Sequence, residues 1–136
     1  MRLSLLSSAL IGLLASEYWP ANRALPDPEP DCFTCSAPQI IDGDTFRCGA
    51  ERIRLASIDA PDMPGHCRPG RRCTPGDPDA ARDFLRRLLH GGIRCQRLET
   101  DHYGRTIARC EASGLNVACA MVDAGHAVER YGRLRC

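Results

Sequence analysis

Lysine is absent from the chain, so all 18 of its cationic side chains are arginine, against 17 acidic residues in a total of 136. Aromatic residues are also scarce at 5%, although hydrophobic residues in the wider sense reach 43%. Glycine and proline occur at ordinary levels, so the composition excludes a collagen-like, coiled-coil or largely disordered chain. The length allows one domain, and a compact globular domain is the expected class.

The longest apolar run, residues 3 to 15, is too short for a membrane-spanning helix. It follows Arg2 and is interrupted only by serines. As a helix it would reach about 20 Å, whereas the hydrocarbon core of a membrane is roughly 30 Å thick. Residues 1 to 15 are therefore predicted to be a signal peptide, and the domain to be secreted or periplasmic. An N-terminal anchor stays open, because Leu13 stands at the minus-three position of a cleavage after Ala15, where a small residue is expected.

Residues 16 to 37 are predicted to form a proline-rich acidic linker and a cysteine-containing lead-in. Prolines at positions 20, 26, 28 and 30, with acidic residues among them, disfavour regular packing. The domain itself is expected over residues 38 to 136. From Ile40 onward the chain holds 16 arginines against 13 acidic residues, a mild excess that permits nucleic-acid binding without demonstrating it.

All nine cysteines lie between Cys32 and Cys136, a density that indicates an oxidising compartment and disulfide bonds. Zinc binding by Cys32-x-x-Cys35 is the competing interpretation, but neither a second such pair nor a His-x3-His pattern follows it. The odd count predicts four bridges and one remaining thiol.

Local sequence suggests how some cysteines pair. Cys67 and Cys73 flank Arg68-Pro69-Gly70-Arg71-Arg72, which favours a turn, so these two are predicted to be bridged. Cys95 and Cys110 would lie nearly opposite each other across a hairpin, where they could be bridged or simply buried together.

Apolar periodicity predicts five strands and two helices. The first helix begins at Asp77-Pro78, a capping residue followed by proline, and ends at Gly91-Gly92. Its five apolar residues between Ala81 and Leu89 share one helical face. The last helix is expected over Val117 to Ala124. The predicted strands are Gln39 to Ile41, Thr45 to Cys48, Ile53 to Ile58, Ile93 to Leu98 and Thr106 to Cys110.

Three strands, a helix, two strands and a closing helix is the element order of an OB-type barrel. We therefore predict a mainly β fold with helices (α+β), a five-stranded OB-fold barrel with a helix between strands 3 and 4 and a C-terminal helix. Another small α+β domain with the same element order stays open as the alternative.

Polar residues gather in three places: Asp42-Gly43-Asp44-Thr45, Arg54 with Asp59-Ala60-Pro61-Asp62, and Asp101-His102-Tyr103-Gly104-Arg105. Each alone is typical of an ordinary turn. Together they bring two carboxylates, Asp44 and Asp59, to neighbouring strand ends, an arrangement that is unfavourable without a cation. Ca2+ takes such carboxylates together with carbonyl and water oxygens. Two flanking arginines would suit a phosphodiester, whose transition state gains negative charge.

At these residues the sequence resembles the thermonuclease family, the staphylococcal-nuclease-like OB-fold enzymes. The resemblance extends from about Ile40 to Tyr131. Its motifs, in chain order, are Ile41-Asp42-Gly43-Asp44-Thr45, Arg54-Leu55-x-x-Ile58-Asp59-Ala60-Pro61, the helix that begins near Asp79, Asp101-x-Tyr103-Gly104-Arg105 and Gly125-x-Ala127.

The resemblance implies a Ca2+-dependent nuclease that hydrolyses DNA and RNA to 3′-phosphate and 5′-hydroxyl ends. By position, Asp44, Asp59 and the carbonyl of Ala60 would hold Ca2+. Arg54 and Arg105 would contact the scissile phosphate.

The same positions imply the remaining roles. Asp62 would be the base or the carboxylate that positions the water. Tyr103 and Tyr131 would flank the nucleotide, an aromatic platform that also suits single-stranded substrates. We further expect a monomer without an obligate protein partner.

Two features depart from the family pattern. The carboxylate at the Asp62 position is usually glutamate there, and aspartate is one methylene shorter. An insertion between Cys67 and Cys73 carries Arg68, Arg71 and Arg72, and it is either a rim that contacts the nucleic-acid backbone or only a solvated loop.

These departures leave two other functions open. One is a nucleic-acid-binding OB domain that has lost turnover through the change at Asp62. The other is a disulfide-stapled interaction domain with no nucleic-acid partner. His102, before Tyr103, could add a weak phosphate contact.

Overall fold

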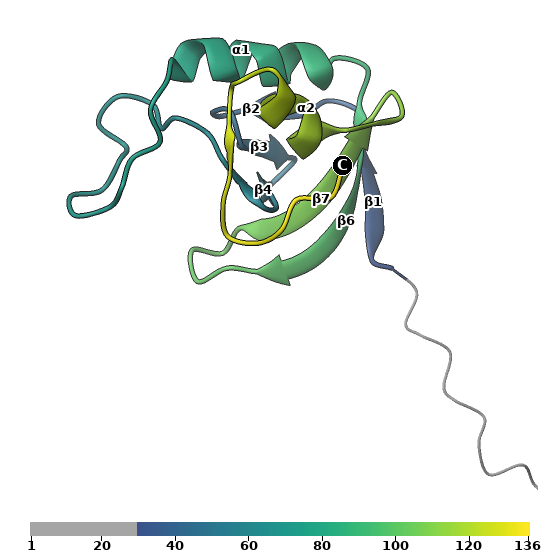
Figure 1. The fold of residues 1–136 in the computed structure, drawn as a ribbon. Coiled ribbons are helices and arrows are strands. Elements are labelled where there is room, and N and C mark those ends of the chain that lie inside the picture. The colour runs from purple at the N-terminus through teal and green to yellow at the C-terminus, as the bar shows by residue number, and fades with distance from the viewer. Residues whose placement is uncertain (1–29) are drawn as a thin grey trace, which may run out of the picture.

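The computed structural model describes residues 30–136, drawn in colour in Figure 1. The predicted signal peptide and most of the predicted linker lie outside the described residues. The elements, in chain order, are β1 (Cys32–Cys35), β2 (Gln39–Ile40), β3 (Thr45–Cys48), β4 (Glu51–Leu55), β5 (Ile58–Asp59), α1 (Pro78–Leu88), β6 (Ile93–Thr100), β7 (Thr106–Ala112), β8 (Leu115–Asn116), α2 (Val117–Asp123) and β9 (Val128–Glu129).

One curved sheet forms the body of the domain. Its strand order is β1-β6-β7-β4-β3-β2, with β8 added beside β7. Neighbours run antiparallel except β4 and β7, which pair in parallel and join the N-terminal meander to the C-terminal hairpin. Strands β2, β3, β4, β6 and β7 correspond to the five predicted strands, and α1 lies between the third and fourth of them. The predicted OB-type fold with two helices is therefore confirmed.

The lead-in before the predicted domain supplies an edge strand. Strand β1 pairs antiparallel with β6, in a register that places Phe33 opposite Cys95. A disulfide then joins Cys35, at the end of β1, to Cys48, at the end of β3. Because β1 and β3 lie toward opposite ends of the strand order, this bond holds the sheet in its curved form.

Helix α1 covers one end of the barrel (Figure 1). The side chain of Asp77 accepts hydrogen bonds from the N–H groups of Asp79 and Ala80, so it caps the helix as predicted. The predicted apolar face points inward, with Ala81, Leu85 and Leu89 buried and Phe84 and Leu88 packed against the same core.

The third predicted strand, Ile53 to Ile58, is wrong in one respect, because the chain breaks it into β4 and β5. Ser57 adopts a φ of 66°, a left-handed conformation that no strand contains. The chain turns at this residue, and β5 pairs with β9 instead of continuing the ladder of β4. The last helix is one residue shorter than predicted and ends at Asp123.

Four disulfides confirm the predicted count: Cys35–Cys48, Cys67–Cys73, Cys95–Cys110 and Cys119–Cys136. The remaining thiol is the exposed Cys32. Since Cys35 is bridged to Cys48, a zinc site at Cys32-x-x-Cys35 has lost one of its ligands. Four bridges in a domain of this size are typical of proteins outside the cytoplasm. Within residues 30–136 neither helix has the length and apolar character that a membrane crossing requires.

Candidate active site

The turn between β2 and β3 brings the first acidic motif against the core. A Cβ atom at Gly43 would lie 2.7 Å from Cβ of Ala60 and 2.8 Å from Cβ of Ala81, so only glycine lets the turn approach both β5 and α1. Asp42 accepts a hydrogen bond from the N–H of Asp44 at 3.1 Å. Burial raises the pKa of Asp42 to about 7, and the neighbouring carboxylate of Asp44 adds to the shift.

Asp44 and Asp59 meet around one guanidinium, as the sequence motifs suggested. Both carboxylates are buried, with 6% and 1% of the residue exposed. Nη2 of Arg54 lies 3.6 Å from Oδ2 of Asp44 and 3.0 Å from Oδ1 of Asp59. Arg54 itself is 7% exposed, so its charge is held inside the protein by these two partners.

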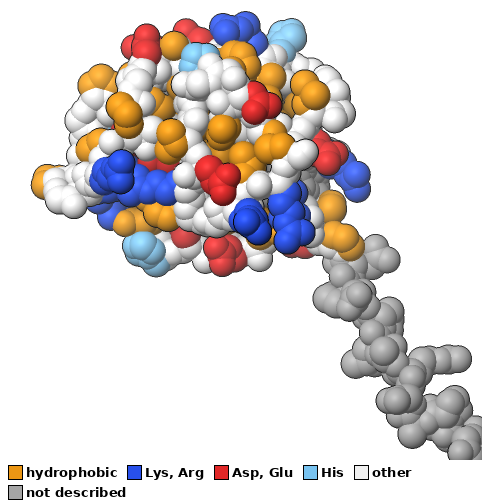
Figure 2. Space-filling model, viewed as in Figure 1, with side chains coloured by type: hydrophobic (Ala, Val, Ile, Leu, Met, Phe, Trp, Pro, Cys, Tyr) orange, Lys and Arg blue, Asp and Glu red, His pale blue; other side chains and the backbone are white. Residues whose placement is uncertain are grey.

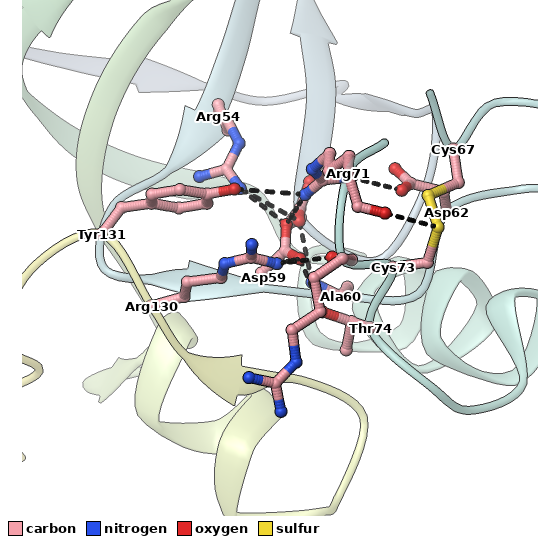
Figure 3. A network of polar contacts seen from close by, with 12 residues as sticks. Arg54, Asp59, Ala60, Asp62, Cys67, Arg71, Cys73, Thr74, Arg130 and Tyr131 are labelled. Carbon is pink, nitrogen blue, oxygen red and sulfur yellow. Dashed lines mark hydrogen bonds and ion pairs between the residues drawn. A yellow bond between two sulfur atoms is a disulfide. The ribbon is translucent and has the colours of Figure 1, made fainter. Parts of the chain in front are cut away.

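Asp59 is the most heavily bonded carboxylate of the site (Figure 3). Besides Arg54, its oxygens accept hydrogen bonds from Nη2 of Arg71 at 2.8 Å, from Oγ1 of Thr74 at 2.6 Å and from Nη1 of Arg130 at 3.2 Å. A carboxylate offers about four acceptor positions, so the capacity of Asp59 is filled. We call the residues around it the Asp59 cluster: Asp44, Arg54, Asp59, Asp62, Arg71, Thr74 and Arg130.

The insertion between Cys67 and Cys73, hereafter the stapled loop, contributes directly to the cluster. Arg71 joins Asp59 to Asp62, with Nη1 at 2.5 Å from Oδ2 of Asp62. Arg68 stacks on Tyr103, with the guanidinium carbon 4.1 Å from the ring centroid, and its Nη1 donates a hydrogen bond to the tyrosine hydroxyl. The side chain of Arg72 is exposed. Arg68 and Arg71 therefore face the site, whereas the side chain of Arg72 is exposed, and a contact of this loop with nucleic acid stays a prediction.

Tyr131 stands beside the cluster because β9 pairs with β5. Its backbone has a φ of 60°, so the chain turns sharply directly after the strand. The guanidinium carbons of Arg54 and Arg130 lie 5.3 Å and 4.9 Å from the ring centroid, and Nη2 of Arg71 lies 3.4 Å from the hydroxyl. Tyr131 is 62% exposed, so a ligand in the cavity can reach its side chain.

The β6–β7 turn holds the second predicted phosphate arginine. Oδ1 of Asp101 accepts hydrogen bonds from the N–H groups of Tyr103 and Arg105, and Oδ2 accepts one from Nε of Arg105 at 2.8 Å. Burial opposes ionisation of Asp101, but the backbone and guanidinium donors of Arg105 outweigh it and lower the pKa of the carboxyl. The pairing fixes Arg105 by Nε and leaves its terminal nitrogens for other partners.

A single cavity of about 790 Å3 connects these groups. Its lining includes six of the predicted site residues: Arg54, Asp59, Asp62, Tyr103, Arg105 and Tyr131. Asp44 and Ala60 are not in the lining and lie beneath it, where the N–H of Ala60 donates a 2.8 Å hydrogen bond to Oδ2 of Asp44. His102 lines the cavity too and packs against the ring of Tyr103.

The oxygen atoms of the site can be compared with the ligands that Ca2+ requires. Asp44 accepts only two hydrogen bonds, from Thr45 and Ala60, and so keeps acceptor positions free. Carboxylate and carbonyl oxygens are the hard donors that Ca2+ takes, so the donor chemistry of Asp44, Asp59 and Ala60 fits the ion once one of the four hydrogen-bond donors to Asp59 leaves. Within residues 30–136, however, no three His, Cys, Asp or Glu side chains form a metal-binding group. Backbone carbonyls and water would have to complete the coordination.

Two members of the Asp59 cluster were not predicted from the sequence. Thr74 follows the stapled loop and Arg130 precedes Tyr131, and neither belongs to a recognisable motif. No sequence signal points to them: they answer the burial of Asp59, a charge with 1% exposure that requires several donors, and only the structure shows that burial.

Comparison with known proteins identifies the family. Residues 52–135 match the model of the staphylococcal nuclease homologue family. The chain is also 34% identical over 96 residues to the succinoglycan biosynthesis protein ExoI of Rhizobium meliloti (strain 1021), an alignment that covers 67% of this chain and 49% of that protein. The chain thus spans about half the length of this curated relative. With the OB-type barrel and the family match over most of the described domain, the chain belongs to the staphylococcal nuclease homologue family.

Proposed function

We propose that this protein hydrolyses phosphodiester bonds of DNA and RNA in a Ca2+-dependent reaction that leaves 3′-phosphate and 5′-hydroxyl ends. The observation that carries the proposal is that one cavity brings together six predicted site residues from separate parts of the chain: Arg54, Asp59, Asp62, Tyr103, Arg105 and Tyr131. Buried charges of both signs around a cavity are a usual sign of a catalytic site.

Arg54 and Arg105 are the proposed phosphate ligands. Each is oriented by its own carboxylate, Arg54 by Asp59 and Arg105 by Asp101, so that neither has to be ordered by the substrate. Paired donors of this kind stabilise the negative charge that the phosphorane oxygens gain in the transition state.

Asp62 is the proposed proton acceptor or water-positioning group. It lines the cavity and is partly exposed, so it can reach a water molecule there. Asp44, Asp59 and the carbonyl of Ala60 would hold Ca2+, which when bound supplies positive charge next to the phosphate. The two tyrosines would stack against sugar or base, which favours single-stranded DNA or RNA.

One face of the molecule shows how its surface charges are distributed. On the face shown in Figure 2, arginine side chains form separate groups with acidic side chains among them. This face shows no continuous basic track, and the proposed phosphate ligands are the arginines of the cavity. We further propose that the protein acts as a monomer, secreted or periplasmic, where its disulfides persist.

A domain that binds nucleic acid without turnover is the second candidate. It is favoured by Asp62, which is shorter than the family's usual glutamate and is engaged by Arg71 at 2.5 Å. The rhizobial relative is named as a succinoglycan biosynthesis protein. The paired arginines of this cavity suit the two-pronged recognition of a phosphodiester.

The deciding experiment incubates oxidised protein with end-labelled single-stranded DNA and RNA in Ca2+, in EGTA and in Mg2+. We expect cleavage in Ca2+ with 3′-phosphate ends, little in Mg2+, because that ion demands near-ideal octahedral geometry, and none in EGTA. Arg105→Ala should abolish cleavage, whereas Arg109→Ala, an exposed arginine outside the cavity, should not. Binding in a mobility-shift assay without cleavage would favour the second candidate, and neither binding nor cleavage would contradict both.

A further inference from the structure

Arg71 occupies the position that joins two of the carboxylates near the proposed metal site. Figure 3 shows its guanidinium between the two carboxylates, and Nη2 lies 2.8 Å from Oδ1 of Asp59 and Nη1 2.5 Å from Oδ2 of Asp62. The side chain is 26% exposed, so the guanidinium reaches the cluster from the solvent side. Arg71 thus supplies the positive charge that these carboxylates require.

Contacts within and directly after the stapled loop hold Arg71 in place beside the cluster. The N–H of Arg71 donates to the carbonyl of Arg68 at 3.1 Å, which closes a turn, and the Cys67–Cys73 disulfide closes the loop around it. Directly after the loop, Thr74 donates to Asp59 at 2.6 Å. The guanidinium is therefore delivered by a short, anchored segment.

Charge in the Asp59 cluster is balanced without a metal ion. Three carboxylates, Asp44, Asp59 and Asp62, face three guanidinium groups, Arg54, Arg71 and Arg130. Asp59 has no acceptor position left, because four donors already use it. An ion that binds Asp59 must therefore displace one of these donors.

Arg71 and Arg130 are the two partly exposed donors to Asp59, with 26% and 28% of their side chains exposed, and of these two only Arg71 has no backbone acceptor. Arg54 is buried and also donates to the carbonyl of Leu55, and Arg130 is held by the carbonyl of Arg72 at 2.9 Å. Thr74 is buried and carries no charge. Arg71 is partly exposed, and its side chain bonds only to two carboxylates and the hydroxyl of Tyr131. Its guanidinium can return to water without leaving a buried charge unpaired once a cation takes its place.

We infer that Arg71 is an internal cation that competes with Ca2+ for Asp59, and that Ca2+ binds by displacing it. The inference rests on the proposed function, because it concerns the proposed metal site. It predicts that the free protein binds Ca2+ less tightly than its oxygen ligands alone would allow, since the measured affinity is reduced by the fraction of molecules in which Arg71 occupies the site.

The test is calorimetric titration of Ca2+ into the oxidised, EGTA-treated full chain and its variants. Arg71→Ala should lower the Kd for Ca2+ about tenfold, as expected if Arg71 occupies the site in nine of ten molecules. Arg71→Gln provides a second variant of similar size, and circular dichroism checks that both fold. Arg72→Ala is the matched control, because it removes one charge from the same loop at an exposed side chain.

Salt separates competition from general charge repulsion. A repulsion between exposed charges weakens at about 0.3 M salt, whereas direct displacement leaves the difference between Arg71→Ala and the wild type in place. An unchanged Kd in both Arg71 variants would overturn the inference while leaving the proposed function intact, and so would equal tightening in Arg72→Ala. Absence of Ca2+ binding in every variant would contradict the metal part of the proposed function and this inference with it.

Discussion

The backbone N–H of Ala60 donates a 2.8 Å hydrogen bond to Oδ2 of Asp44. The bond ties the turn before β3 to the residue directly after β5, and both residues are buried. Asp44 also accepts a 2.8 Å bond from the hydroxyl of Thr45. The carboxylate proposed as a metal ligand therefore has a structural role as well.

Substitutions at Asp44 should separate these two roles. Asp44→Ala leaves the buried N–H of Ala60 without a partner, so we expect it to lose about 1 to 3 kcal/mol of unfolding free energy. Asp44→Asn keeps an acceptor oxygen but loses the charge, and should unfold close to the wild type while losing Ca2+ binding and cleavage. Urea unfolding and calorimetry measure the two effects. Wild-type Ca2+ affinity in Asp44→Asn would remove Asp44 from the metal site.

The two phosphate arginines should differ in what their loss does to stability. Arg54 is 7% exposed between two carboxylates, and Arg105 is partly exposed beside Asp101. Changing either to lysine should reduce turnover by about 100-fold or more, because the two-pronged donor geometry is lost. Arg54→Ala should in addition destabilise the fold by about 3 to 5 kcal/mol, since it leaves buried carboxylates unpaired. Thermal unfolding measures the stability of the Arg54 and Arg105 variants, and a cleavage assay measures their turnover. Equal losses of stability in the two alanine variants would contradict this prediction.

Local chemistry made most of the fold predictable. Asp77 followed by Pro78 fixes the start of α1, and the spacing of apolar residues identifies the face that it buries. The break between β4 and β5 was not predictable, because a serine in the left-handed conformation is decided by the pairing of β5 with β9, a contact far apart in the sequence.

The candidate site was predictable where its residues belong to family motifs. The motif spacing brings Arg54, Asp59 and Asp62 to one cavity. The stapled loop lies outside these motifs, and whether its arginines point into the site or into solvent depends on which side of the loop faces Asp59. Sequence therefore left the role of Arg71 open, and the side-chain contacts decide it.

The disulfide pattern predicts a defined thiol content. Peptide mapping of unreduced protein should show four bridges, with Cys67 linked to Cys73 and Cys32 as the free thiol. Replacing both Cys67 and Cys73 by serine should cost about 2 kcal/mol or less, because the closed loop is short. The same change should raise proteolysis within the loop. Nine free thiols in active protein from its native compartment would contradict the expected oxidising environment.

An ion pair between β4 and β6 predicts a pH dependence of stability. Hydrogen bonds from Arg97 lower the pKa of Glu51 to about 2, with Thr106 as a further donor, from 4.5 without such contacts. Because the pKa of Glu51 is lower in the folded state, this ion pair stabilises the fold at pH values above the unfolded pKa. The stabilisation is lost as the pH falls through the folded pKa. In urea unfolding at pH 6, the wild type should have a free energy of unfolding about 1 kcal/mol higher than that of Glu51→Gln, after allowance for solvent screening. This difference should vanish between about pH 4.5 and 2. Glu111→Gln, at an exposed position on β7, should show no such trend.

Asp62 offers the sharpest test of the proposed chemistry, because it is where this chain departs from its family. A general base must lie within about 2.6 to 3.2 Å of the proton that it takes, or act through one water molecule. The missing methylene of Asp62 withdraws its carboxylate by about an ångström. In the free protein Arg71 also engages this carboxylate, with Nη1 at 2.5 Å from Oδ2.

If reach limits the rate, Asp62→Glu should raise turnover without tightening substrate binding, and Asp62→Asn should nearly abolish turnover. Asp123→Glu and Asp123→Asn, at an exposed position on α2, are the matched controls and should leave both quantities unchanged. Single-turnover cleavage together with substrate affinity measures the split between rate and binding. Cleavage by Asp62→Asn at the wild-type rate would show that Asp62 is not the base, and would leave the roles of Arg54 and Arg105 to be judged on their own variants.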